Sequence, residues 1–398
     1  MESSQSTQAQ VSADPLVQGL GPIKWILGLF GFMLRSGSEL TRLVGEMHHA
    51  ISQTPPPFAR DIELDSGKAH KSYLLLRMMM EYGADRLHQF ADSIPSVEHP
   101  PVPVRRFRSA INGVMGDKLQ EWGHPLRQAM ELVNEDGRAL SLSDLQQQHA
   151  RGVVLFVHGL CLSEWDWQSH AHGAFVSDLR QQGYGVGWLR YNSGLPIWEN
   201  GPEMARWLDA RWRDDSAQRL TLIGHSMGGL VIRSALHHAE QEQKSSWLGA
   251  VSHVALLATP HAGAPLEKLG NMANSLLGVS PYSKPLMALG NIRSQGIRSL
   301  RYGNITVPVD AGGIQQPVPL RDELNYFLLA ARLGDDPARH WIGDGLVPVH
   351  SAMGEGHFPD PHPRIEKVLL EDVGHLRLLQ DARTYDALRR WLALDTLH

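Results

Sequence analysis

Short apolar runs alternate with helix-like stretches along the chain after residue 150. The runs are Gly152–Val157, Tyr184–Leu189, Leu220–Ile223, Val251–Ala258, Leu324–Leu329 and Val368–Leu370. Helical stretches near residues 199–213, 227–241 and 381–393 separate some of them. This alternation is typical of a mostly parallel sheet with helices on both faces. We therefore predict an α/β domain over residues 151–398.

The first 150 residues have a different pattern, in which apolar residues recur at helical spacing between proline clusters. One face is formed by Leu40, Leu43, Val44, Met47 and Ile51, and a second by Tyr73, Leu76, Met80, Leu87 and Phe90. The stretch "TPPPF" and residues 95–103 end these segments, because proline interrupts a helix. We predict a helical N-terminal extension over residues 1–150, with Met78–Met80 in its core and "RRFR" at 105–108 on a solvated face.

Residues 265–323 do not fit the alternation. They are rich in Gly, Ser and Pro and carry short apolar clusters such as "NSLLGV" and "PLMALG". We expect a cap or lid insertion over the site at this position.

The stretch "LIGHSMGGL" places Ser226 between Gly224 and Gly228. A buried strand precedes it and an amphipathic helix follows it, so the serine lies where a strand turns sharply into a helix. Small neighbours allow the strained backbone that exposes such a hydroxyl. Ser226 is therefore the candidate nucleophile, and an ordinary glycine-rich strand–helix turn is the alternative interpretation.

A serine nucleophile needs a base, and the chain has 21 histidines from which to choose. His375 follows the last strand and a glycine-containing loop, which brings it to the same sheet edge as Ser226. We expect His350, His357 and His362 to lie on the surface, and His158 and His225 to pack against or orient the site.

The base must be oriented by an acid that follows the serine in the chain. Asp344 stands between two glycines in "IGDGLVPVHSA", where a tight turn can aim a short carboxylate. Asp335 and Asp336 are the competing candidates, although adjacent aspartates are typical of a surface turn.

Acyl transfer also requires donors for the developing oxyanion. The backbone N–H of Met227 begins the helix after the nucleophile, and the N–H of Leu160 follows His158 and Gly159 in "VLFVHGLCLSEWDW". Both are candidate donors. Cys161 has apolar neighbours and no base nearby in sequence, so we interpret it as a packing residue.

The stretches "VHGL", "IGHSMGGL", "ATPHAGAP", "GDGLVP" and "GHLRLL" resemble, in order and spacing, bacterial lipases and esterases of the α/β-hydrolase superfamily. The set looks most like the branch with GPI-inositol-deacylase-like and triacylglycerol-lipase proteins, and it covers residues 150–395. The resemblance implies an α/β-hydrolase fold. It also implies a triad of Ser226, Asp344 and His375, with Leu160 and Met227 as oxyanion donors.

Aromatic residues gather in the two loops expected to border the site. Trp165, Trp167 and Trp198 are the candidate substrate-binding residues, beside Trp188, Tyr191, Leu195 and Ile197. They form either an apolar acyl-binding wall or anchors that hold the loops to the sheet. With the insertion at 265–323, they favour an ester or lipid with an apolar acyl chain. An acyltransferase, a thioesterase and a catalytically silent lipid-binding or membrane-binding module are the alternatives.

Composition and charge limit the classes of ligand and partner that we expect for this protein. The formal net charge is −5 and the pI is about 6.5, which gives no electrostatic argument for nucleic acid. The sequence contains no zinc-protease motif, paired-cysteine ligand set or phosphate-binding loop, so we expect no metal and no cofactor. One cysteine excludes internal disulfides and fits a cytoplasmic location.

The stretch "WILGLFGFML" at 25–34 is apolar and lies between Lys24 and Arg35. As a helix it is about 15 Å long, roughly half of what crossing a bilayer requires. Three interpretations remain open for this stretch: it docks on the protein's own surface, makes a peripheral membrane contact, or belongs to an unusual export signal.

Overall fold

The computed structural model describes residues 31, 34–35, 38, 66–93, 102–213, 218–242, 245–265, 268, 294–308, 318–334, 343–359 and 362–394. The chain divides into two compact units. One comprises residues 1–100 and 123–126, and the other comprises residues 101–122 and 127–398.

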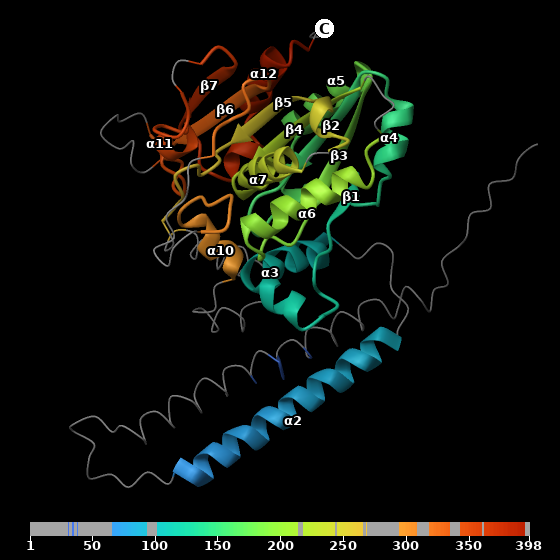
Figure 1. The fold of residues 1–398 in the computed structure, drawn as a ribbon, viewed down its shortest axis with the longest axis vertical. Coiled ribbons are helices and arrows are strands. Elements are labelled where there is room, and N and C mark those ends of the chain that lie inside the picture. Colours follow the sequence, from blue (N-terminus) through green and yellow to red (C-terminus); the bar gives the residue numbers. More distant parts are fainter. Residues whose placement is uncertain are drawn as a thin grey trace, which may run out of the picture. The chain divides into compact units, whose positions relative to one another are not determined.

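The second unit is built on a seven-stranded sheet with the order β1-β3-β2-β4-β5-β6-β7 (Figure 1). The strands are β1 (Glu131–Val133), β2 (Gly152–Val157), β3 (Tyr184–Arg190), β4 (Arg219–His225), β5 (Val251–Leu257), β6 (Asn325–Arg332) and β7 (Ile365–Glu371). Only β1 pairs antiparallel, with β3, and the other neighbours in this sheet are parallel. The carboxyl ends of β2 to β7 therefore meet at one edge.

Helices cover both faces of the sheet (Figure 1). Helices α6 (Ile197–Asp209) and α7 (Met227–Gln241) bury their apolar side chains on one face, against Val153, Leu155 and Val157 of β2. Helices α5 (His170–Gln181) and α12 (Ala382–Trp391) cover the other face, against Val154 and Phe156. Successive residues of β2 thus enter opposite cores, as strand geometry requires.

The unit also contains the longer helix α3 (Val102–Glu121) and the short helices α4 (Leu142–Gln148), α10 (Gln295–Leu300) and α11 (Val349–Ala352). Single 3₁₀ turns are η1 (Glu164–Trp167), η2 (Leu248–Ala250) and η4 (Arg377–Leu379). Helix α3 has a kink at Met115, whose φ is −137°.

The predicted fold class is confirmed in its mostly parallel sheet and its two helical layers. The sheet unit begins at residue 101, earlier than the boundary near 150 that the sequence suggested. Strand β1 accounts for part of this difference, because three residues are too few to give a readable alternation.

The first unit holds helix α2 (Ser66–Ser93). Residues from the region of the apolar N-terminal stretch pack on it: Leu34 Cδ1 lies 3.3 Å from a β-carbon placed at Gly83, and Arg35 pairs with Asp85. The methionine run does not form a core here, since Met78 and Met79 are 58% and 64% exposed.

Other sequence predictions fall partly or wholly outside the described residues. These are the helix over residues 40–51, most of the stretch at 25–34, much of the insertion at 265–323, and Asp335 with Asp336. Within the described ranges, no helix combines the length and apolar character that a membrane span requires.

Candidate active site

Ser226 links β4 to α7 in a strained conformation. Its φ of 53° and ψ of −122° lie in a region that non-glycine residues rarely adopt, at a cost of about 1–3 kcal/mol. Neighbouring strands hold this turn, because Ser226 N–H donates to the carbonyl of Leu257 at 2.8 Å. A β-carbon at Gly228 would lie 2.3 Å from the carbonyl oxygen of Val157, so only glycine allows α7 to approach β2 this closely.

Asp344 and His375 come from the loops after β6 and β7 and form a buried pair. His375 Nδ1–H donates to Asp344 Oδ2 at 2.7 Å. Asp344 Oδ1 accepts from the N–H groups of Leu346 and Val347 at 2.9 and 2.8 Å. The flanking glycines make this turn possible, since φ is 58° at Gly343 and 94° at Gly345. The carboxylate is therefore held at both oxygens.

The Asp344 bond fixes the tautomer of His375, whose Nε2 carries the free lone pair. Nε2 is buried and forms no hydrogen bond with any described residue. An unliganded site often shows such an open base, because catalytic hydrogen bonds tighten when substrate binds. A nitrogen with a free lone pair can accept the proton of a serine nucleophile.

His225 packs beside the pair. Its Nε2–H donates to the backbone carbonyl of His375 at 3.2 Å, and the two ring centroids are 4.8 Å apart. Burial, with the neighbouring His375, lowers the pKa of His225 well below its usual value. His225 is thus a neutral contact that orients the His375 backbone.

The loop after β2 lies directly against Ser226. A β-carbon at Gly159 would lie 3.1 Å from Ser226 Cβ. The N–H of Leu160 donates to no other described residue, and the N–H of Met227 has no acceptor one turn back because it begins α7. Both predicted oxyanion donors are therefore without a partner within the part of the chain that the structure describes.

His158 holds the peptide that carries one of these donors. Its Nδ1–H donates to the Gly159 carbonyl at 2.8 Å, which leaves Nε2 to accept from Tyr191 N–H at 3.4 Å. In a planar trans peptide the Gly159 carbonyl and the Leu160 N–H point in opposite directions. Fixing the carbonyl thus fixes the donor. Burial lowers the pKa of His158 to about 4, so the ring is neutral near pH 7.

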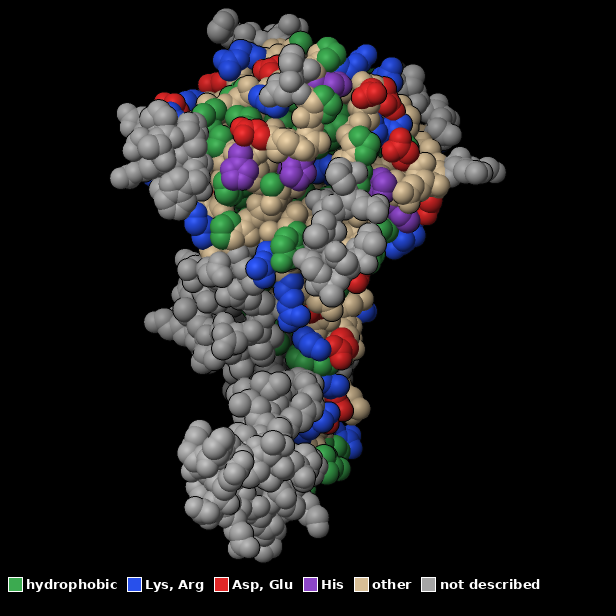
Figure 2. All heavy atoms as spheres, turned by 60° about the vertical axis from the view of Figure 1, so that its left-hand side comes forward, with side chains coloured by type: hydrophobic (Ala, Val, Ile, Leu, Met, Phe, Trp, Pro, Cys, Tyr) green, Lys and Arg blue, Asp and Glu red, His purple; other side chains and the backbone are tan. Residues whose placement is uncertain are grey.

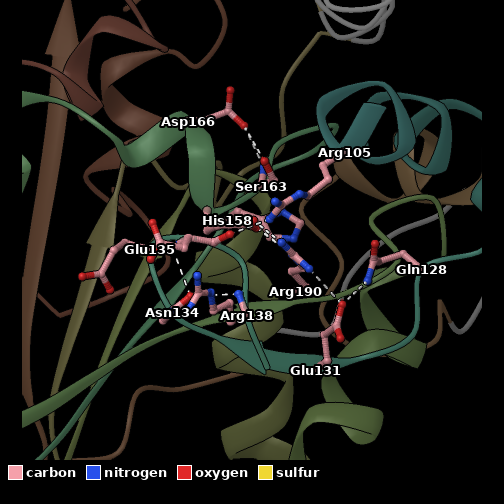
Figure 3. Close-up of polar contacts among 12 residues, drawn as sticks. Arg105, Gln128, Glu131, Asn134, Glu135, Arg138, His158, Ser163, Asp166 and Arg190 are labelled. Carbon is pink, nitrogen blue, oxygen red and sulfur yellow. Dashed lines mark hydrogen bonds and ion pairs between the residues drawn. The ribbon is translucent and has the colours of Figure 1, made fainter. Parts of the chain in front are cut away.

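A buried ion pair between Arg190 and Glu164 anchors the far end of this loop, and Figure 3 shows that Arg190 also contacts Glu131. Arg190 Nε donates to Glu164 at 2.7 Å, a second bond joins Nη2 to the other oxygen, and Nη1 reaches Glu131 at 3.1 Å. Glu164 is 2% exposed. Burial acts to lower the pKa of Arg190, and the bonds to Glu164 and Glu131 more than offset this and raise it. The loop is tied to β3 and β1 at once.

Helix α3 also supports the loop, which the sequence did not reveal. A β-carbon at Gly113 would lie 2.2 Å from Cys161 Sγ, and the carbonyl of Gly113 accepts from the Ser294 hydroxyl at 2.6 Å. The N–H of Cys161 donates to Ser193 Oγ at 3.1 Å. Cys161 itself is buried, and burial raises the pKa of its thiol.

The basic stretch at 105–108 is not simply a solvated face. Arg105 lies 5.1 Å from the centroid of the Trp165 ring and donates to the Asp136 carbonyl. Arg108 donates to the Arg127 carbonyl and is half-buried.

The three candidate substrate residues have different surroundings. Trp167 is fully buried, with its ring 5.0 Å from Phe156 in the core under α5. Trp165 and Trp198 are half-buried. Trp167 thus matches the interpretation as an anchor, and the roles of the other two remain predictions.

The three histidines expected on the surface are exposed or half-buried. His350 is on α11, His357 bonds to the Glu355 carbonyl, and His362 lies 3.7 Å from Asp322. Among the described residues, no group of three His, Cys, Asp or Glu side chains could hold a metal. On the face drawn in Figure 2, acidic and basic side chains are interspersed.

Comparison with known proteins bears on the fold around this site. A family model described as a PGAP1-like alpha/beta domain matches residues 210–325, which include β4, Ser226 and α7. A search of curated proteins finds no match.

Several solved structures are similar at low identity. The mature form of a Bacillus licheniformis lipase is 18% identical, with 62% of this chain and 93% of that chain covered and a TM-score of 0.41. An esterase from a Rhodococcus species is 16% identical, with coverage of 67% and 100% and a TM-score of 0.37. A thermophilic esterase from Thermogutta terrifontis is 14% identical, with coverage of 67% and 92% and a TM-score of 0.33. The family match supports the predicted resemblance to a PGAP1-like branch over residues 210–325.

Proposed function

We propose that the protein is a serine hydrolase that cleaves carboxylic esters, preferably those with apolar acyl chains. One observation carries the proposal. A serine with positive φ at a strand–helix turn shares its sheet edge with a buried aspartate–histidine pair whose free nitrogen is unpaired. This combination meets the requirements of an activated nucleophile.

In the proposed reaction, Ser226 Oγ attacks the ester carbonyl while His375 Nε2 takes its proton. Asp344 stabilises the resulting imidazolium through Nδ1–H. The N–H groups of Leu160 and Met227 stabilise the oxyanion of the tetrahedral intermediate. His375 then protonates the departing alcohol, and an acyl-enzyme remains on Ser226. Water, activated by the same histidine, releases the acid.

An apolar acyl group is proposed from the side chains around the two donors. Leu160 and Met227 belong to one buried apolar cluster with Ile197 and Ile297. Burying a methylene group in such surroundings contributes about 0.8 kcal/mol. The same triad supports acyltransferases and thioesterases, which remain alternatives because only the acceptor or leaving group differs. We also propose a cytoplasmic location, with peripheral membrane contact through residues 25–34.

Labelling with a fluorophosphonate probe tests the proposal. The wild-type protein should be labelled at Ser226, and Ser226→Ala should lose both labelling and turnover of short p-nitrophenyl esters while it unfolds at a similar temperature. Ser193→Ala is a matched control, since its hydroxyl binds the Cys161 N–H rather than the base. Turnover that survives in folded Ser226→Ala contradicts the proposed nucleophile. If the wild-type protein is itself unlabelled, the result favours the alternative of a catalytically silent binding module.

A further inference from the structure

Arg233 is a buried cation on helix α7, about two turns beyond Ser226. The residue is 4% exposed, and its guanidinium carbon lies 4.7 Å from the centroid of the Phe358 ring. Nη2 donates to the Val318 carbonyl at 2.9 Å, and Nη1 donates to His261 Nδ1 at 3.3 Å. Nε is buried and has no acceptor among the residues that the structure describes.

None of these contacts neutralises the charge. Burial lowers the pKa of Arg233 to about 10, so the guanidinium is still protonated at pH 7. His261 is neutral, because burial first, and then Arg233, lowers its pKa well below the usual value. Among the described residues, no carboxylate lies within ion-pair distance of Arg233. Buried charges in proteins are nearly always paired, since an unpaired one is costly.

A small cavity of about 10 Å³ adjoins Arg233, between α7 and residues 318–321. Arg321 and Tyr326 line it as well. Arg321 Nε is buried without an acceptor. The Tyr326 oxygen accepts from Arg321 N–H at 3.2 Å, so its own proton remains available to donate. Burial raises the pKa of Tyr326 to about 12, which keeps that phenol neutral.

Donors therefore exceed acceptors around the cavity. The acidic lining residue is Glu240, and its carboxylate already lies 3.3 Å from Arg321 Nη1. His237 also lines the cavity, and burial lowers the pKa of its ring. The site thus combines an uncompensated guanidinium with further N–H and O–H donors.

We propose that this cavity is a binding site for one small monovalent anion, chloride in solution, held between Arg233, Arg321 and Tyr326. The volume is close to the minimum for one water molecule, which favours a single small ion over phosphate or a larger carboxylate. Water would satisfy donors but would leave the guanidinium without a counter-charge. The anion joins residues 318–321 to α7 and so stabilises the fold, in addition to the chemistry proposed at Ser226.

Thermal unfolding of the full-length protein in sodium chloride and in sodium gluconate, at equal ionic strength, tests the site. Gluconate is too large for the cavity. The midpoint should be higher in chloride by about 2 °C once chloride exceeds its dissociation constant several-fold. Arg233→Met should lose this difference. Arg211→Met, which removes an exposed arginine next to Trp207, should retain it.

Two further measurements keep the test decisive if Arg233→Met does not fold. Tyr326→Phe keeps the cation but removes one donor, so it should need a several-fold higher chloride concentration for the same shift. Crystals grown in bromide should show an anomalous peak in the cavity. Equal midpoints in the two salts, a chloride-specific shift that persists in Arg233→Met, or an empty bromide map each overturn the proposal.

Discussion

At the scale of single residues, Asp344 uses its two carboxylate oxygens for different tasks. One oxygen holds the turn through Leu346 and Val347, and the other accepts the proton-bearing nitrogen of His375. Replacement by asparagine can keep the turn, because the amide oxygen still accepts backbone N–H groups. The amide nitrogen then faces His375 Nδ1 and favours the wrong tautomer.

We therefore expect Asp344→Asn to lower kcat by roughly 10³–10⁴ while changing the unfolding temperature little. Ester turnover and thermal unfolding measured together check this. Asp335→Asn and Asp336→Asn are the comparison variants, since these residues compete for the same role on sequence grounds. A larger loss of kcat at either of them would mean that the acid has been misassigned.

His172 is a buried residue whose surroundings predict a pH dependence of the free energy of unfolding. Both ring nitrogens are buried without hydrogen-bond partners, among Phe156, Trp188 and Tyr385. Burial is the main cause that lowers its pKa from 6.5 to about 3. Between these values the unfolded chain binds a proton that the folded protein does not. The free energy of unfolding therefore falls as the pH falls below about 6.5.

Between pH 7 and pH 5, the free energy of unfolding of His172→Phe should fall by about 2 kcal/mol less than that of the wild type. Urea unfolding at the two pH values measures the difference. His170→Phe, at an exposed position on the same helix, is the control and should keep the wild-type pH dependence. Identical pH slopes for wild type and His172→Phe would contradict the assigned cause.

At the scale of elements, the loop after β2 depends on a pair that links it to β3. Breaking the Arg190–Glu164 pair leaves the buried Glu164 without its two hydrogen bonds from Arg190, and breaking such a buried pair typically costs about 3–5 kcal/mol, which the nearby Arg105 offsets in part. We expect Arg190→Met to lose stability of this order in urea unfolding. Arg180→Met removes an exposed pair with Glu135 and should cost less than about 1 kcal/mol. Adding Glu164→Gln to Arg190→Met should restore part of the loss, and no recovery argues against the pair as the cause.

The same loop shows which parts of the molecule the sequence can predict. Strands β2 to β7 can be predicted because buried parallel strands are largely apolar runs. The candidate triad followed from residue order after those strands. Helix α5 was missed, since the sparse apolar positions Phe175, Val176 and Leu179 gave no clear period.

Contacts between distant segments were also beyond the sequence. Gly113 of α3 contacts Cys161, which lies 48 positions later in the chain. The local sequence "INGVMG" contains no pattern that predicts this contact. Arg190 and Glu164 look like ordinary surface charges until the fold brings them together. Local pattern thus predicts most of the strands and a candidate triad, and tertiary packing determines what supports them.

At the scale of the whole molecule, the open question is what the N-terminal apolar stretch contacts. An ester with a long acyl chain resides in a membrane or micelle, so an enzyme that cleaves it gains from binding that surface. Trp25, Phe30 and Phe32 are residue types that anchor proteins at the membrane interface. In the first unit, however, Gly31 and Leu34 pack on α2, which favours docking on the protein for one side of the stretch.

Deletion of residues 1–36 separates the two roles. If the stretch contacts lipid, we expect the truncated protein to bind anionic liposomes more weakly and to hydrolyse soluble short-chain esters within a few-fold of the full chain. Co-sedimentation with liposomes and soluble-ester kinetics for both proteins provide the measurements. Glu81→Ala is a useful companion, because it loosens the contact of α2 with Ser38 without removing any apolar residue. Equal liposome binding by full-length and truncated protein removes the membrane interpretation, whereas aggregation of the truncated protein favours a structural strap that covers α2.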